Sequence, residues 1–283
     1  MFLYKTVTAL QNHLQERRKE GKAIGFVPTL GALHRGHGSL IKASLNKQCY
    51  TVVSIYVNPT QFNDVDDLAK YPRPLVRDLQ FLFDLGCDVL FLPTDGEVYP
   101  DGRKAGPDLD LRHLGTTLEA AFRPGHFEGV LQVVDRLLNI VQPDILFMGE
   151  KDLQQLLVIR KLIESKKLSI ELEAVPTVRE ENGLALSSRN ERLTAEHRAA
   201  ASLIYTTLSW VAENFKSDKL EDLKSEAIAH LNQSPFRPEY FEFVRGDNLQ
   251  ILSQKDEYQG VIYAVTAVWC TDIRLIDNMA MPD

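Results

Sequence analysis

The stretch Phe26-Val-Pro-Thr-Leu-Gly-Ala-Leu-His34-Arg-Gly-His37-Gly-Ser-Leu-Ile41 joins a strand pattern to a helix pattern through a turn that contains glycine. Apolar residues lead up to the turn, and beyond it apolar residues recur at the spacing of one helix face. His34 and His37 stand three apart at the expected helix start, so both rings project to one side. Unpaired N–H groups and the positive end of the helix dipole favour phosphate there. The stretch therefore predicts a strand–turn–helix unit with a phosphate-binding turn, and the alternative is a plain connection with two exposed histidines.

Length and composition place the chain among soluble globular proteins. It has 283 residues, 44% hydrophobic and 25% charged, which suggests about two domains. The net charge of −7 argues against a general nucleic-acid binder. No apolar run approaches the roughly 18 residues of a membrane-spanning helix, and the first residues lack the pattern of a signal peptide. Cys49, Cys87 and Cys270 are far apart without C-x-x-C, as expected for reduced structural cysteines in a cytoplasmic protein.

The first part of the chain alternates helix and strand patterns, which is typical of an α/β fold. A first helix is expected over 8–20, and the clearest helical stripe runs over 128–141. Strands are expected at about 22–27, 50–57, 88–92, 144–148 and 170–175. Several are continuous apolar runs, as in buried parallel strands. The pattern predicts a Rossmann-like doubly wound parallel sheet over residues 1–178, with ligands at the carboxyl ends of its strands.

The pattern changes after Pro176. Thr194 is a plausible N-cap for a long helix reaching about Phe215, and 217–231 resembles a second helix. Strand-like stretches follow at 240–244, 260–268 and 271–276. Residues 179–283 are therefore expected to form a smaller C-terminal α+β domain.

Several polar residues follow the expected strands of the first domain. Gln61, in Asn58-Pro-Thr-Gln-Phe62, can offer a donor and an acceptor to a hydroxy acid, or can belong to a polar turn. Arg73 reads first as a surface charge, and Asp78 as an ordinary acid of a first helical turn, although Asp78 is also a candidate Mg²⁺ ligand. Arg123 lies beside a Pro-Gly turn that suits anion binding, or it simply pairs with Glu119 four residues earlier.

Two further motifs suggest phosphate binding. Lys151, in Gly149-Glu-Lys-Asp-Leu-Gln-Gln155, is a cation at a helix N-terminus, where it opposes the dipole unless an anion binds. The stretch Leu186-Ser-Ser-Arg-Asn190 places two hydroxyls and an arginine in the junction between the domains, where they can clamp a triphosphate or cap a helix. G-x-G-x-x-G and Walker A motifs are absent from the sequence, and His37 stands where a Walker lysine would be.

Together these motifs resemble the pantoate–β-alanine ligase family, within the H-I-G-H nucleotidyltransferases that are similar to class I aminoacyl-tRNA synthetases. The resemblance covers essentially the whole chain. It extends over the motifs quoted above and also over Tyr71-Pro-Arg73, Arg123-Pro-Gly-His-Phe127, Asn139-Ile-Val-Gln-Pro-Asp144 and Arg274-Leu-Ile-Asp-Asn278. The sequence departs from the usual family pattern at Leu30, Gly38 and Gln132, where methionine, a larger apolar residue and threonine are common.

The resemblance implies a set of site residues. His37, His34 and Lys151 act on the phosphates, with His37 as the usual proton donor, and Gln61 and Gln155 bind pantoate, with Gln61 also at the β-alanine site. Arg123 matches an arginine near the active site. The implied ATP contacts are Leu30, Gly31, Ala32, Leu33, His34, Arg35, Gly36, His37, Gly149, Glu150, Lys151, Asp152, Val178, Leu186, Ser187, Ser188 and Arg189.

The implied activity is the ATP-dependent condensation of (R)-pantoate with β-alanine through a pantoyl-adenylate, with Mg²⁺ accompanying ATP and no metal held by the protein alone. A homodimer is also implied. Two alternatives remain: an adenylyltransferase acting on a phosphate ester, which would need more basic residues than Gln61 and Gln155 supply, and a non-catalytic nucleotide-binding module.

Overall fold

The computed structural model describes residues 1–62, 65–215, 220–254 and 258–282. The chain divides into two compact units. The first comprises Met1–Glu150 and Gln155–Pro176, and the second comprises Lys151–Gln154 and Thr177–Asp283. The domains expected from the sequence, 1–178 and 179–283, place Lys151–Gln154 and residues 177–178 in the first domain, whereas both segments group with the second unit.

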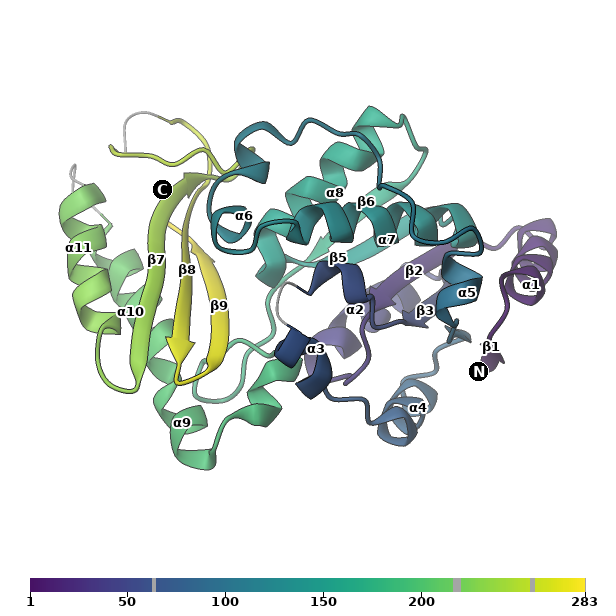
Figure 1. The fold of residues 1–283 in the computed structure, drawn as a ribbon, viewed down its shortest axis with the longest axis horizontal. Helices are drawn as coiled ribbons and strands as arrows, with labels where there is room; N and C mark the ends of the chain where they lie inside the picture. The colour runs from purple at the N-terminus through teal and green to yellow at the C-terminus, as the bar shows by residue number, and fades with distance from the viewer. Residues whose placement is uncertain (63–64, 216–219, 255–257, 283) are drawn as a thin grey trace. The chain divides into compact units, whose positions relative to one another are not determined.

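The first unit is built on a six-stranded parallel sheet, which confirms the predicted fold class (Figure 1). The sheet order is β1-β4-β3-β2-β5-β6. The strands are β1 (Phe2–Tyr4), β2 (Ile24–Thr29), β3 (Tyr50–Ile55), β4 (Val89–Phe91), β5 (Ile145–Gly149) and β6 (Glu171–Val175). The chain passes from β2 to β3 on one side, and β5 pairs with β2 on the other, so the order reverses at β2. Such a reversal opens a crevice at the carboxyl ends of the strands.

Strand β1 was not predicted from the sequence. This strand has only three residues, and its first two are exposed, so it carries no alternating apolar pattern. It is recognisable only through its pairing with β4, in the register Phe2↔Val89 to Tyr4↔Phe91.

Helices pack on both faces of the sheet. The helices that begin in the first unit are α1 (Val7–Lys19), α2 (Arg35–Asn46), α3 (Val65–Lys70), α4 (Leu75–Asp84), α5 (Asp95–Val98), α6 (Glu119–Phe122) and α7 (His126–Val141). Helix α8 (Leu153–Ser165) follows the 3₁₀ turn η3 (Glu150–Asp152), and two more such turns are η1 (Pro59–Gln61) and η2 (Arg112–Gly115). One core cluster joins Val27, Val53 and Phe147 of the strands to α2 and α4. Because successive strand side chains alternate between faces, Phe26 and Leu146 point to the opposite face, where α7 lies against β2.

Two glycines allow α2 to pack closely. A Cβ at Gly25 of β2 would lie 2.2 Å from Ser44 Oγ of α2, so only glycine permits this approach. A Cβ at Gly38 would lie 3.1 Å from Phe81 Cζ of α4. The Phe81 ring thus occupies the space that a larger residue at position 38 would need.

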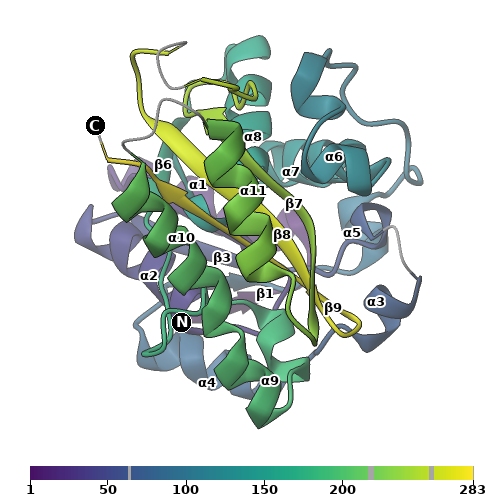
Figure 2. The ribbon, with the colours of Figure 1, turned by 90° about the vertical axis from the view of Figure 1, so that its left-hand side faces the viewer.

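The second unit is an antiparallel three-stranded sheet with helices on it (Figure 2). Its strands are β7 (Phe236–Arg245), β8 (Ile262–Cys270) and β9 (Ile273–Ala280), in the order β7-β8-β9. Helices α10 (Ser202–Asn214) and α11 (Leu220–Leu231) cover one face and share a core cluster with the sheet. The 3₁₀ turn η4 (Ser188–Arg192) and α9 (Ala195–Ala200) precede them.

The single helix expected from Thr194 to Phe215 is wrong. Thr194 does cap a helix, because its Oγ1 accepts a hydrogen bond from the His197 N–H at 3.1 Å. That helix ends at Ala200, and the fully buried Ala201 redirects the chain with ψ of −9°. Packing of α10 on the core therefore overrides local helix preference. Residues 217–219, the expected start of the next helix, lie outside the described residues.

Two other expectations concern the whole chain. No described helix is both long and apolar enough to cross a bilayer. Cys49, Cys87 and Cys270 are free and buried, and burial raises the pKa of the Cys87 thiol to about 12. Burial also raises the pKa of the Cys49 and Cys270 thiols, which disfavours the reactive thiolate at all three positions.

Candidate functional site

A buried carboxylate holds the turn that follows β2. Gly31 and Ala32 both have positive φ, of 84° and 49°, so the chain reverses tightly there. The Asp78 side chain, 2% exposed, accepts hydrogen bonds from the Ala32 and Leu33 N–H groups, each at 2.8 Å. Asp78 lies in the first turn of α4, as the sequence suggests, but its carboxylate satisfies donors 45 and 46 residues away in sequence. It thereby determines where α2 begins.

His34 and His37 cap α2 reciprocally. His34 is the N-cap residue, and its Nδ1 accepts from the Gly36 N–H at 3.1 Å. His37 Nδ1 accepts from the His34 N–H at 3.3 Å. This is a capping box in which two imidazoles replace the usual hydroxyl and carboxylate.

The capping bonds determine which nitrogen of each ring carries the proton. A nitrogen that accepts from a backbone N–H has its lone pair free for that bond, so each Nδ1 is unprotonated and each neutral ring bears its proton on Nε2. The ring centroids are 4.1 Å apart. The first turn of α2 therefore carries two neighbouring Nε2–H groups, and such donors suit phosphoryl oxygens.

A second element of the first unit supports Gln61. Asn58, fully buried, uses its Nδ2 to donate to Thr60 Oγ1 at 2.9 Å and to the Gly129 carbonyl of α7 at 3.1 Å, and the same Nδ2 lies 3.4 Å from Gln61 Oε1. His126 Nδ1 lies 2.8 Å from the Gln61 carbonyl, which can only accept, so His126 donates. His126 thus holds the main chain of Gln61, and Asn58 contacts its side-chain amide.

Gly129 allows η1 to contact α7. A Cβ at this position would lie 2.4 Å from the Thr60 carbonyl oxygen and 2.8 Å from the Gln61 backbone nitrogen. Asn58, Gly129 and the His126 ring were not predicted from the sequence as supports for Gln61. The available signals were Asn58 directly before a proline at a strand end, and a glycine inside a helix that is otherwise apolar.

Topology places the candidate residues of the first unit at one edge of its sheet. The strands β3, β2 and β5 are neighbours and parallel, so their carboxyl ends lie on the same edge. Gln61 follows β3, and the histidine pair follows β2. Gly149 is the last residue of β5, and Glu150 comes directly after it. Gln155, in the first turn of α8, is half-buried, while Leu156 and Leu157 beside it are buried.

The remaining candidates belong to the second unit. Lys151 is 17% exposed, and its Nζ lies 3.7 Å from Asp152 Oδ1. Residues 178–186 form a hairpin in which the Leu186 N–H donates to the Val178 carbonyl at 3.0 Å. The hairpin leads into η4, where Ser187 Oγ accepts from the Arg189 N–H at 3.3 Å and Ser188 is buried. Lys151 and the Ser187–Arg189 segment are therefore both held within the same unit.

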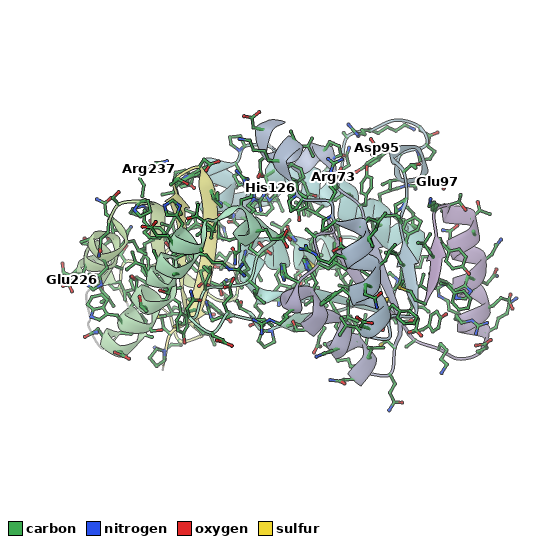
Figure 3. All side chains as sticks on the ribbon, turned by 90° about the horizontal axis from the view of Figure 1, so that it is seen from below. Arg73, Asp95, Glu97, His126, Glu226 and Arg237 are labelled. Carbon is green, nitrogen blue, oxygen red and sulfur yellow. The ribbon has the colours of Figure 1, made fainter. Side chains whose placement is uncertain are left out.

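The two uncertain arginines differ in their surroundings. Arg123 Nη1 lies 3.7 Å from Oε2 of Glu119, a buried carboxylate, so the pairing considered from the sequence is present. Arg73 is exposed, as expected for a surface charge, and is labelled with His126 in Figure 3. Among the residues that the structure describes, none form a group of three or more His, Cys, Asp or Glu side chains able to hold a metal.

Comparisons with known proteins agree over the whole chain. A family model described as pantoate-beta-alanine ligase matches residues 3–280. A pantothenate synthetase from Bacteroides thetaiotaomicron is 44% identical over 283 residues, covering 99% of this chain and 98% of the relative. The crystal structure of pantothenate synthetase from Thermus thermophilus matches with a TM-score of 0.90 and 37% identity, over 100% of both chains.

A third match was solved with ligands. The pantoate-beta-alanine ligase of Francisella tularensis, complexed with beta-gamma ATP and beta-alanine, matches with a TM-score of 0.80 and 34% identity. The match covers 99% of this chain and 97% of that one.

The contact at Gly129 yields a structural prediction. In Gly129→Ala the added methyl group meets backbone atoms that cannot rotate away, so η1 must move and Gln61 with it. Overpacking of this kind lowers the free energy of unfolding by about 1–3 kcal/mol. Urea denaturation measures the loss, and a crystal structure of the variant shows the displacement.

Gly96→Ala is the matched control. Gly96 also lies in a helix, but a Cβ there would have no neighbour within 4 Å, so its stability should not fall. Unchanged stability of Gly129→Ala, with Thr60 and Gln61 in place, would contradict the proposed role of this contact.

Proposed function

The chain belongs to the pantoate–β-alanine ligase family, and from this membership we propose that it condenses pantoate with β-alanine to give pantothenate, AMP and pyrophosphate. It is thus an AMP-forming ligase that makes a carbon–nitrogen bond. The observation that carries the proposal is the pair of Nε2–H donors that His34 and His37 present at the N-terminus of α2, beside the strand at which the sheet order reverses. The Francisella tularensis relative complexed with beta-gamma ATP and beta-alanine supports it.

The reaction needs two steps because a carboxylate does not react with an amine at neutral pH. In the first step a pantoate carboxylate oxygen attacks the α-phosphorus of ATP, a new P–O bond forms, and pyrophosphate leaves. In the second step the β-alanine nitrogen attacks the acyl carbon of pantoyl-adenylate, the amine loses a proton, and AMP leaves. No protein nucleophile takes part, so the protein acts by aligning reactants, an effect that can supply about 7–11 kcal/mol.

We assign phosphate stabilisation to three of the candidate residues. His34 and His37 donate through Nε2–H to phosphoryl oxygens, and Lys151 adds a positive charge. Negative charge develops on the phosphates as the α-phosphorus becomes five-coordinate, and donors already in place stabilise it without reorganising. Ser187, Ser188 and Arg189 are proposed as further phosphate ligands, and the other ATP contacts implied by the resemblance stay predictions.

We assign the acceptor to the glutamines. Gln61 and Gln155 each offer a donor and an acceptor, which suits the hydroxyl groups and carboxylate of pantoate. Gln61 is also proposed to border the β-alanine. Both side chains are neutral, so neither supplies the positive charge that a second phosphate ester would require.

Mg²⁺ is proposed to enter with ATP. Magnesium in nucleotide sites is held mainly by phosphates and water, with one or two carboxylates, so a dedicated cluster of protein ligands is not needed. Asp78, the carboxylate considered from the sequence, is 2% exposed and already accepts the Ala32 and Leu33 N–H groups, so it is better explained as a support of the turn than as a ligand of the ion. The ion would neutralise phosphate charge during AMP transfer. A homodimer and a cytoplasmic location stay predictions from the sequence.

An assay of AMP release with single omissions tests the function. AMP should form rapidly only when ATP, pantoate and β-alanine are all present. With pantoate but no β-alanine, the enzyme should release about one equivalent of pyrophosphate and retain the adenylate. Pyrophosphate release with a phosphate-ester acceptor in place of pantoate would favour the adenylyltransferase alternative, and no turnover of ATP in any mixture would favour a binding module.

Substitution of the proposed phosphate ligands gives a second prediction. His37→Ala and Lys151→Ala should each slow adenylate formation by at least about tenfold at saturating ATP and pantoate. Lys151→Ala should leave thermal stability almost unchanged, because its ion pair with Asp152 is loose. His37→Ala also loses a capping bond, which should lower stability by roughly 1 kcal/mol. Rapid-quench measurement of pyrophosphate gives the rate.

Lys161→Ala serves as the control, since Lys161 lies on α8 and its removal also deletes one positive charge. Its adenylation rate should equal that of the unaltered enzyme. Wild-type rates in His37→Ala and Lys151→Ala, or equal slowing in Lys161→Ala, would refute the assignment.

A further inference from the structure

Asn278 contacts the backbone of Lys151. It lies on β9, is 7% exposed, and its Nδ2 donates to the Lys151 carbonyl at 2.9 Å. The two residues are 127 positions apart in sequence. Lys151–Gln154 group with the second unit even though the residues on either side of them group with the first. The Asn278 amide thus makes a tertiary hydrogen bond that anchors this short segment to β9.

The residue before Asn278 is held by a buried ion pair. Asp277 is 4% exposed and receives two bonds from Arg179, from Nη1 at 2.5 Å and from Nη2 at 3.0 Å. Asp277 Oδ1 also accepts from the Asn278 N–H at 2.8 Å. Burial raises the pKa of the Asp277 carboxyl above its ordinary value, and the hydrogen bonds and charge of Arg179, with a smaller effect of the Lys151 charge, offset that rise only in part. The carboxylate therefore both orients the Asn278 backbone and interacts with the charge of Lys151.

Arg179 joins this cluster to the hairpin that precedes η4. It donates to the Gly183 carbonyl at 3.1 Å and to the Asn278 carbonyl at 3.2 Å, and its guanidinium lies over the Tyr205 ring. Residues 179 and 185 form a β-bridge within the hairpin, and η4 lies against β9. The edge strand β9 (Figure 2) therefore supports both second-unit segments that are proposed to bind phosphate.

We propose that Asn278 is a positioning residue for AMP transfer, acting through Lys151. Its amide holds the main chain from which the Lys151 side chain extends, and the Asp277–Arg179 ion pair holds Asn278 in turn. The proposal rests on the assignment of Lys151 to the phosphates. Loss of the amide frees Lys151 to shift, and a misplacement of about 1 Å can slow a reaction by roughly a hundredfold.

The double-mutant cycle of Asn278→Ala and Lys151→Ala tests this proposal. Because Asn278 binds the carbonyl of residue 151, Lys151→Ala keeps the hydrogen bond and removes only the charge. Asn278→Ala alone should slow adenylate formation by about tenfold or more, through kcat rather than the KM for β-alanine. In the Lys151→Ala background the same substitution should change the rate by less than about twofold while still lowering the melting temperature.

Leu275→Ala is the matched control for lost stability. Leu275 lies on the same strand and is buried in the core of the second unit, so this variant should lose stability without losing adenylation rate at a temperature where it is folded. If Asn278→Ala does not fold, Asn278→Leu, which is similar in size and also lacks the donor, replaces it in the cycle.

Three results would overturn the proposal. If the double variant is slowed by the product of the two single-variant factors, Asn278 does not act through Lys151. If Leu275→Ala slows adenylate formation as much as Asn278→Ala does, the slowing comes from lost stability alone. If Lys151→Ala forms the adenylate at the wild-type rate, the assignment of Lys151 to the phosphates is itself refuted. The other two results leave that assignment intact.

Discussion

The carboxylate of Asp78 is the contact on which the arrangement of the first unit most depends. The turn after β2 leaves the N–H groups of Ala32 and Leu33 buried, and such groups need partners. Asp78 supplies both bonds from α4, at 2.8 Å each. A charged acceptor makes these bonds stronger than neutral ones, so the turn is held in one conformation despite two successive positive φ angles. The position of α2, and with it the histidine pair, follows from this contact.

The histidine pair combines a structural role with a chemical one. Each Nδ1 accepts a backbone N–H at the start of α2, which stabilises the helix end and directs the proton to Nε2. The same bonds thus leave the proton on the Nε2 atom of each neutral ring, as the proposed donation to phosphate requires. The Asn278–Lys151 bond in the second unit also combines a structural role with a proposed chemical one. Asn278 binds the main-chain carbonyl of Lys151, so the bond does not use the charged side chain that is proposed to bind phosphate.

The sequence indicated those features that depend on local patterns. The parallel sheet followed from apolar runs and helical stripes, and the pairing of His34 with His37 followed from their spacing. It did not reveal β1, whose three residues are recognisable only by their partner β4, or the end of a helix at Ala200, which packing determines. The contacts of Asp78 with Ala32 and of Asn278 with Lys151 join residues 46 and 127 positions apart. No local pattern encodes such pairs, although Arg274–Asn278 was already visible as a motif without a role.

The proposed mechanism depends above all on His34 and His37 being neutral rings that donate to ATP phosphates through Nε2–H. Two-dimensional ¹⁵N–¹H NMR of the imidazole nitrogens, with and without a non-hydrolysable ATP analogue, measures this directly. At neutral pH both rings should be Nε2–H tautomers before the analogue is added, and its binding should shift the Nε2 signals while both Nδ1 signals stay those of unprotonated nitrogens. Rings that carry the proton on Nδ1, or Nε2 signals that do not respond to saturating analogue, would contradict the account.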